Sequence, residues 1–254
     1  MRVVIAVIAS KSYEAFLSNW KSIKIPPNMK IFYIFGEGTM PMSESLSWDR
    51  LMSSVETVEE AMRLAIETTR KRDEETLKKI LDGMGKPQLR GDEIWVNCPE
   101  SISPGIHLKT KAAFEYFLEN EEFDIVIRTN LSSLFHLEKL YNWLLDKPRE
   151  NASFGYLTFS SFLSGCGYGL TRDVVEDFVK TEFSATDIMT EIDDMILHKY
   201  LSNKGVERYG WEMDSYESGK NMASSTHFHL RFKTDNRIQD AAEQSKYITQ
   251  VLNK

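Results

Sequence analysis

The order of apolar segments in residues 1–38 constrains the fold more than any other feature of the sequence. Residues 3–9 form a continuous apolar run rich in β-branched side chains, which is typical of a central parallel strand buried on both faces. Apolar side chains recur at helical spacing over residues 13–20, and residues 31–35 form a second apolar run. This strand–helix–strand order predicts an α/β fold with a doubly wound, mostly parallel sheet.

The rest of the chain continues the alternation of strands and helices. A charged, helix-forming stretch over 43–90 predicts a helical insertion, and an amphipathic pattern over 235–254 predicts a C-terminal helix. The length of 254 residues fits one large domain, so we expect a single α/β domain over 1–254, with helices flanking the central sheet. Further strands are predicted over 93–97, 123–128, 153–159 and 227–232, and further helices from residues 103, 137, 174 and 191.

Charge and composition narrow the classes of partner. The net charge of −7, from 38 acidic and 31 basic side chains, argues against nucleic acid as the main partner, because binding phosphates along a polyanion requires an excess of Lys and Arg. A local basic pocket for a small diphosphate remains compatible with this charge.

Two cysteines, Cys98 and Cys166, are too few for a disulfide framework and favour a reducing compartment. No stretch has the length of a membrane span, so we expect a soluble, cytoplasmic protein.

Three polar clusters follow predicted strands or begin a predicted helix. Residues 128–133 come directly after an apolar strand, residues 164–169 form a glycine-rich segment that we expect to be a turn, and residues 191–194 open a helix. Ligands of open α/β sheets bind beyond the carboxyl ends of the strands. The clusters therefore define the candidate site.

The order of these clusters resembles the galactosyltransferase and fringe group of GT-A glycosyltransferases. Here the order is Leu-Lys-Thr (108–110), Phe-Asp-x-x-x-Arg-Thr-Asn-x-Ser (123–132), Ser-Gly-Cys-Gly-Tyr-Gly-Leu-Thr-Arg-Asp (164–173) and Glu-Ile-Asp-Asp-Met (191–195). The group has Leu-Lys-Thr in a helix, Lys-Thr-Asp-Asp-Asp at a strand end, Ser-Gly-Gly-Gly-Tyr-Val-Leu-Ser in a turn, and Glu-Asp or Asp-Asp before a helix. No single motif is specific, and the resemblance depends on the order of four.

The resemblance implies a GT-A-like (Rossmann-like) fold and a hexosyltransferase activity. A hexose would pass, with inversion, from a nucleotide diphosphate sugar, a UDP-sugar above all, to a hydroxyl of a glycan. Carried over by register and by position after the first strand, the expected donor-binding residues are Ala9, Ser10, Lys109, Arg128, Asn130 and Ser132. Arg231 and Lys233 share one face of the predicted strand over 227–232 and are expected to join them, the alternative being a solvated basic edge strand.

One departure from the group concerns its metal. The acidic triplet that holds a divalent cation in the group is replaced here by Asn130, Leu131 and Ser132, and an amide and a hydroxyl are weaker ligands for Mn²⁺ or Mg²⁺ than carboxylates. Either Ser132 holds a cation weakly with His227 or His229, or the positive charges of Arg231 and Lys233 replace it. A plainer alternative is that Asn130 and Ser132 cap a following helix.

Inverting transfer needs a general base that removes the acceptor proton. Asp194, with Asp193 second, is the expected base, although acidic residues at a helix start are also favoured by the helix dipole alone. Gly165 and Gly167 are expected to let a sugar approach the backbone closely. Trp211 could stack on a sugar face, but isolated aromatic residues usually belong to the core.

Two other functions stay open. Loss of the acidic triplet would also suit a catalytically degenerate module that binds sugar nucleotides or glycans without turnover. A nucleotidyltransferase-like Rossmann enzyme is the second alternative, but residues 9–12 (Ala-Ser-Lys-Ser) do not form the glycine-rich phosphate loop expected after its first strand.

Overall fold

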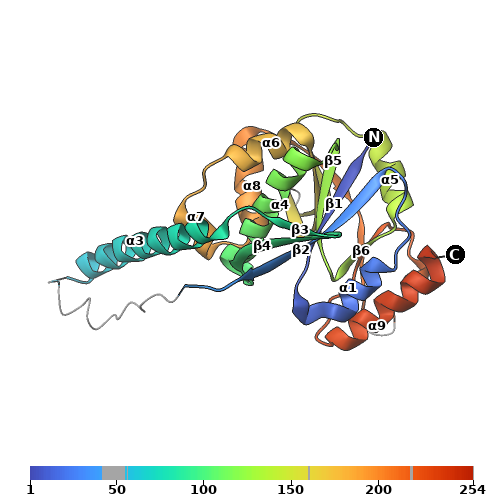
Figure 1. The fold of residues 1–254 in the computed structure, drawn as a ribbon, viewed down its shortest axis with the longest axis horizontal. Helices are drawn as coiled ribbons and strands as arrows, with labels where there is room; N and C mark the ends of the chain where they lie inside the picture. The colour runs from blue at the N-terminus through green and yellow to red at the C-terminus, as the bar shows by residue number, and fades with distance from the viewer. Residues whose placement is uncertain (42–54, 56, 160, 218–219, 254) are drawn as a thin grey trace.

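The computed structural model describes residues 1–41, 55, 57–159, 161–217 and 220–253. It contains a large mixed sheet with helices on both faces (Figure 1). The strands are β1 (Val3–Ile8), β2 (Met29–Gly38), β3 (Gln88–Arg90), β4 (Glu93–Pro99), β5 (Ile125–Asn130), β6 (Ser133–Phe135), β7 (Ala152–Thr158), β8 (Phe162–Thr171), β9 (Glu207–Trp211), β10 (Met213–Ser215) and β11 (His229–Arg231). The helices are α1 (Glu14–Lys21), α3 (Val58–Met84), α4 (His107–Asn120), α5 (Leu137–Leu145), α6 (Arg172–Lys180), α7 (Ala185–Thr190), α8 (Asp193–Lys204) and α9 (Arg237–Tyr247).

The main sheet has eight strands in the order β3-β4-β2-β1-β5-β8-β7-β9. Neighbours pair in parallel at β2–β4, β1–β2, β1–β5 and β7–β9, whereas β3–β4, β5–β8 and β7–β8 are antiparallel. The predicted mostly parallel sheet is therefore present, with antiparallel strands inserted on one side of β5. All six residues of β1 are buried, as its continuous apolar sequence predicts.

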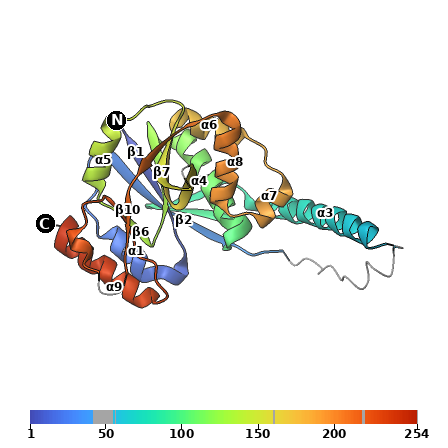
Figure 2. The same ribbon diagram turned by 180° about the vertical axis from the view of Figure 1, so that it is seen from behind.

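Helices cover the sheet as two layers with separate cores (Figures 1 and 2). The odd-numbered residues of β1 pack with α1, α5 and α9, while the even-numbered ones pack with α4, α6, α8 and the C-terminal part of α3. Trp20 of α1 and Phe117 of α4 are fully buried on opposite faces. The strand period of two sorts the side chains of β1 between these two cores.

The N-terminal part of α3 extends away from the body of the molecule (Figure 1). Val58, Met62 and Ile66 are more than half exposed along one side of it, and its C-terminal part returns to the body through Leu77 and Ile80. The predicted insertion over 43–90 is helical over 58–84, but residues 88–90 form β3 instead. Residues 43–54 and 56 of that prediction lie outside the described residues.

Strand β8 corrects the prediction of a glycine-rich turn over 164–169. Gly165, Gly167 and Gly169 alternate along this strand, and each leaves room for a neighbouring side chain. A Cβ atom on Gly167 would stand 2.7 Å from Phe135, and one on Gly169 would stand 2.7 Å from Ile127. The glycines are thus spaced by the strand period of two and serve close packing across the sheet.

A second sheet of three strands, in the order β10-β11-β6, lies beyond the end of β5. Strand β6 pairs antiparallel with β11, so that Ser133 faces Arg231. The strand predicted over 227–232 is shorter in the structure, where β11 covers His229–Arg231. The C-terminal helix predicted over 235–254 begins at Arg237, with Asn236 as its N-cap. Among the described residues, no helix combines the length and the apolar character that crossing a membrane requires.

Candidate functional site

A pocket of about 540 Å³ opens beyond the carboxyl ends of β1 and β5, the place where open α/β sheets bind ligands. Four cationic side chains line it together with a single carboxylate, although the whole chain is acidic. The lining residues are Ile8, Ala9, Ser10, Ser12, Tyr13, Glu100, Ser101, Ile102, Ile106, Lys109, Asn130, Leu131, Ser132, Arg231, Lys233 and Arg237.

Two other pockets differ from this one in the charges of their lining side chains. One of about 610 Å³ lies beside the start of α5 and contains Lys24 and Glu138, and one of about 540 Å³ lies between α1 and α9 and contains Glu14 and Arg237. Each combines one cationic with one acidic side chain, so neither gathers charge of one sign. We therefore place the candidate site in the pocket beyond β1 and β5.

The turn between β5 and β6 shapes one wall of this pocket. Trp20 Nε1 donates hydrogen bonds to the carbonyl oxygens of Leu131 and Ser133, at 3.1 and 3.0 Å, and Gln244 Nε2 donates to the Leu131 oxygen at 3.0 Å. Helices α1 and α9 thereby hold the turn between them. Because β6 follows directly, Asn130 and Ser132 do not cap a helix, which excludes the plainer interpretation of these two residues.

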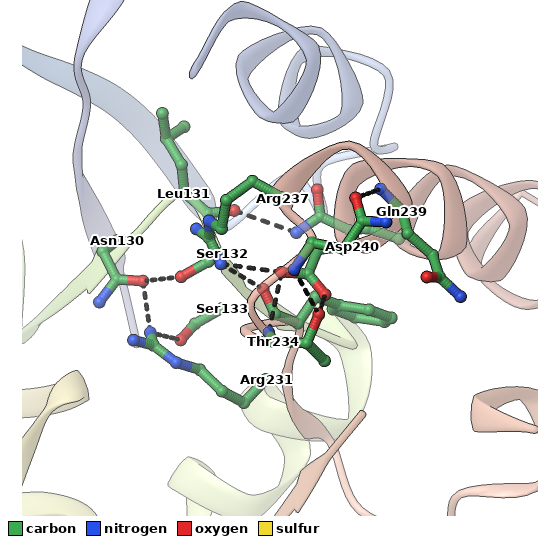
Figure 3. Close-up of polar contacts among 12 residues, drawn as sticks. Asn130, Leu131, Ser132, Ser133, Arg231, Thr234, Arg237, Gln239 and Asp240 are labelled. Atoms are coloured by element: carbon green, nitrogen blue, oxygen red, sulfur yellow. Dashed lines mark hydrogen bonds and ion pairs between the residues drawn. The ribbon is translucent and has the colours of Figure 1, made fainter. Parts of the chain in front are cut away.

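Arg231 enters the same wall from β11 (Figure 3). Its Nη1 donates to Asn130 Oδ1 at 2.6 Å and to Ser133 Oγ at 2.8 Å, while Ser132 Oγ donates to the same Asn130 oxygen at 3.0 Å. Burial lowers the pKa of Arg231 below its ordinary value, and the charges of Arg237 and Arg128 lower it further. The antiparallel pairing of β6 with β11 brings these groups together from positions about a hundred residues apart.

Lys109 reaches the pocket from α4, and its residue is only 1% exposed. Its Nζ donates to the carbonyl oxygen of Ala9 at 3.2 Å and forms an ion pair with Glu100. Glu100 also accepts a bond from the Gly36 backbone N–H at 3.4 Å. Glu100 therefore compensates the buried ammonium charge, which lies between the ends of β1 and β4.

Arg237, at the start of α9, forms the far side of the pocket. It pairs with the buried Asp240 at 3.0 Å, and its guanidinium lies over the rings of Tyr13 and Phe16. Asp240 also accepts from the N–H and the hydroxyl of Thr234, at 2.9 and 2.8 Å. Figure 3 shows this group beside Arg231, so two guanidinium groups meet at one pocket.

Arg128 does not line the pocket but lies behind it, on β5. It is 2% exposed, pairs with Asp193 at 2.5 Å and donates to the carbonyl oxygen of Gly165. Burial raises the pKa of Asp193, an effect that the charge of Arg128 opposes. The pair joins β5 to the start of α8 and has no open face toward a substrate.

Asp194 lies beside the pair and next to β8. Its Oδ2 accepts a hydrogen bond from the Gly165 backbone N–H at 2.9 Å, and its Oδ1 is buried with no hydrogen-bond partner among the described residues. Asn130 Nδ2 donates to the Gly165 carbonyl oxygen at 3.2 Å. Two hydrogen bonds on one residue, Gly165, therefore connect the wall of the pocket with Asp194.

Gly165 thus holds a carboxylate close to the backbone, since a Cβ atom there would stand 3.0 Å from Asp194 Oδ2. Gly167 contacts Phe135 and His229 in the core, not the pocket. The structure gives both glycines a packing role and places no open space beside Gly167.

The two candidate metal histidines lie apart from Ser132. His229 is fully buried, stacks on Phe135 and accepts a 3.0 Å hydrogen bond from Trp211 Nε1 at its Nδ1. Burial lowers its pKa to about 3. His227 precedes β11, with its Nδ1 3.3 Å from Asp214. Neither histidine lines the pocket.

A divalent cation does not fit the residues present at the pocket. The oxygen of Asn130 is already occupied by a guanidinium and a hydroxyl, and neither imidazole reaches the pocket. The part of the chain that the structure describes contains no group of three or more His, Cys, Asp or Glu side chains that could hold a metal ion.

Trp211 is 5% exposed and belongs to an aromatic cluster with Phe135, Trp143 and Phe228. Its N–H is used by His229. This buried position corrects the expectation of a ring available to a sugar and agrees with the alternative that Trp211 is a core residue.

Several residues that line the pocket were not predicted from the sequence. Glu100 follows β4 and could have been found by the rule that ligands lie beyond strand ends. The same rule applies to Ser12 and Tyr13, which follow β1, whereas Arg237 gives no such signal, because the packing of α9 against α1 brings it to the pocket. Of the predicted donor-binding residues, seven line the pocket, namely Ala9, Ser10, Lys109, Asn130, Ser132, Arg231 and Lys233.

No family model and no curated protein matches this chain. Among solved structures, it is similar to the galactosyltransferase LgtC in complex with donor and acceptor sugar analogues, at 9% identity and a TM-score of 0.48 over 100% of this chain and 97% of that one. It is also similar to the apo form of the glycosyltransferase GlyE from Streptococcus pneumoniae TIGR4, at 10% identity and a TM-score of 0.44 over 99% of this chain and 64% of that one. The inositol-1-phosphate CTP transferase from T. maritima gives 10% identity and a TM-score of 0.43 over 99% and 98%. Similarity at this level of sequence identity and TM-score does not assign an activity to this chain.

Proposed function

We propose that this chain is a glycosyltransferase that moves a hexosyl group from a nucleotide diphosphate sugar, a UDP-sugar above all, to a hydroxyl of a glycan. The observation that carries the proposal is the pocket beyond β1 and β5, where Lys109, Arg231, Lys233 and Arg237 face a single carboxylate in an otherwise acidic chain. Such a gathering of cations suits a diphosphate, whose oxygens accept charge-assisted hydrogen bonds.

The transfer breaks the bond between the anomeric carbon and the diphosphate oxygen, and the electron pair leaves with the nucleoside diphosphate. In this proposal Arg231 neutralises the charge that develops there, with no reorganisation of solvent, and Lys109, which the diphosphate shares with Glu100, contributes a second positive group. Their positions are fixed in advance by Asn130, Ser133 and Glu100. Fixed donors of this kind stabilise a transition state more than flexible ones.

Asp194 is the proposed general base. The acceptor hydroxyl attacks the anomeric carbon and gives its proton to Oδ1, the carboxylate oxygen without a partner, while Gly165 holds Oδ2. That oxygen is buried in this structure, so the acceptor reaches it only after a local rearrangement. A single displacement of this type inverts the configuration at the anomeric carbon.

A thermal-shift panel tests the proposal. UDP-sugars and GDP-sugars should raise the melting temperature, because a ligand that binds only the folded state stabilises it. Donor hydrolysis or transfer to a glycan, measured on the ligand that gives the largest shift, then separates an enzyme from a binding module without turnover. Larger shifts with nucleoside triphosphates than with nucleotide sugars would contradict the proposal and favour nucleotidyl transfer.

A further inference from the structure

We propose that Arg231 takes the place of a divalent cation at the donor diphosphate, so that this chain binds its donor without metal. The inference rests on the proposed function and specifies how its pocket works. It follows from three features of the structure: a cation without an acidic partner, acceptor groups that are already used, and guanidinium N–H groups that have no partner among the described residues.

The first feature is the position of the Arg231 charge. Among the described residues, its hydrogen bonds go to two neutral oxygens, Asn130 Oδ1 and Ser133 Oγ, and it forms no ion pair (Figure 3). A partly buried charge is ordinarily paired. The one carboxylate of this pocket, Glu100, is paired with Lys109, so the unpaired Arg231 is suited to an anionic ligand. The nearby Arg237 differs, because Asp240 already neutralises it.

The second feature is the use of the polar groups that stand in place of the acidic triplet. Asn130 gives its oxygen to Arg231 and Ser132, and its amide nitrogen to Gly165. A dication at this oxygen would stand against the Arg231 guanidinium and be repelled by it. Asp193, a buried carboxylate at the start of α8, is occupied by Arg128.

The third feature is the direction of the guanidinium hydrogen bonds. Nη1 alone holds Asn130 and Ser133, so the remaining N–H groups of Arg231 have no partner among the described residues. A guanidinium presents its N–H groups in a planar fork that matches two phosphate oxygens. Arg231 donates to the departing oxygen and transfers no proton; the leaving diphosphate simply gains hydrogen bonds as its charge grows.

The test measures binding of UDP and of inorganic pyrophosphate by calorimetry, in buffer with EDTA and in buffer with Mn²⁺. We expect both probes to bind in EDTA, with a UDP dissociation constant that Mn²⁺ does not lower. UDP binding that requires Mn²⁺ would overturn the inference and leave the proposed function intact. Pyrophosphate binding in EDTA without UDP binding would support the inference and contradict the proposed function. Failure of both probes in both buffers would contradict both.

Two variants sharpen the result. Arg231→Gln should raise the UDP dissociation constant in EDTA by about tenfold or more, the loss expected for charge-assisted hydrogen bonds. The matched control Arg63→Gln removes the same charge from the exposed side of α3 and should change nothing. Equal affinity of Arg231→Gln and wild type, at an unchanged melting temperature, would overturn the inference.

Asn130→Asp gives opposite results under the two mechanisms. If Arg231 binds the diphosphate, the new carboxylate pairs with it at the present 2.6 Å contact and weakens UDP binding in EDTA. If a metal binds here, the new carboxylate improves its site and strengthens UDP binding in Mn²⁺. Stronger binding of UDP by Asn130→Asp in Mn²⁺ than by wild type in either buffer would overturn the inference.

Discussion

At the scale of single residues, the neighbours Asp193 and Asp194 have different surroundings. Asp193 is closed in an ion pair with Arg128, whereas Asp194 keeps one oxygen without a partner. Asp193 and Asp194 are therefore not equivalent candidates for the general base. A substitution at Asp193 acts through folding, and a substitution at Asp194 tests catalysis.

Asp194→Asn should lower glycosyl transfer by about 10²-fold or more, the lower range for loss of a general base. UDP binding should be unchanged, because Asp194 does not line the pocket and the amide oxygen can still accept from Gly165. Transfer rates and UDP affinity measured on the same preparation decide the point. Asp187→Asn, a carboxylate on α7 whose side chain is 33% exposed, is the control. Transfer at the wild-type rate by Asp194→Asn would exclude Asp194 as the base.

Asp193→Asn should lower the free energy of unfolding by about 3–5 kcal/mol, because it leaves Arg128 as an uncompensated buried charge. The double variant Arg128→Met/Asp193→Leu removes both charges and should recover most of that loss. Urea unfolding measures both. A double variant as unstable as the single one would show that the pair is needed for more than mutual neutralisation.

At the scale of elements, the second half of the sheet differs most from its prediction. The apolar run of β1 and the amphipathic helices are local patterns, so their positions follow from the sequence. The glycines of β8 also have a local pattern, a spacing of two. Glycine is so common in turns, however, that a segment with this spacing predicts a turn. Only the side chains of Phe135 and Ile127, far away in the chain, explain why the strand needs glycine.

The candidate site also combines residues that local sequence patterns locate with residues that only long-range packing brings together. Asn130 and Ser132 follow an apolar strand and could be located from the sequence, as could Lys109 from its motif. The contact of Arg231 with Asn130 depends on the pairing of β6 with β11, which no local pattern encodes. The burial of Trp211 and His229 likewise results from long-range packing, so sequence patterns alone could not separate core aromatics from ligand-binding ones.

Gly167→Ala should lower the free energy of unfolding by about 1–3 kcal/mol, the usual cost of overpacking, because the added methyl group would stand 2.7 Å from Phe135 and 3.0 Å from His229. Gly83→Ala is the matched control in α3, where nothing lies within 4 Å of the added methyl group. There alanine should stabilise by about 0.5–1 kcal/mol through its helix propensity. Equal effects of the two substitutions on chemical unfolding would contradict the packing role of β8.

At the scale of the whole molecule, buried histidine makes stability depend on pH. Burial lowers the pKa of His107 to about 4, with Lys111 adding to the effect, and its Nε2 has no hydrogen-bond partner among the described residues. The unfolded chain takes up a proton near pH 6.5, which the folded chain takes up only near pH 4. Stability therefore falls as the pH falls through this window.

The slope should reach about 1.4 kcal/mol per pH unit for one such histidine. His107→Leu should reduce the fall in the free energy of unfolding between pH 6 and pH 5 by nearly this amount, and should leave the dependence between pH 8 and pH 7 unchanged. Urea unfolding at each pH gives both numbers. An identical acid dependence of variant and wild type would show that His107 is protonated in the folded state as easily as in the unfolded state.

The central position of β1 in the sheet has a consequence for synthesis of the chain. Strand β1 has β2 on one side, but its other neighbour is β5, and the Arg2 backbone N–H donates to Asp124 across 122 positions. A ribosome needs on the order of ten seconds to make that length of chain. Throughout this interval β1 presents an apolar strand with one unpaired edge, a template for association with other nascent chains. The protein should therefore depend on a holding chaperone until β5 has left the ribosome.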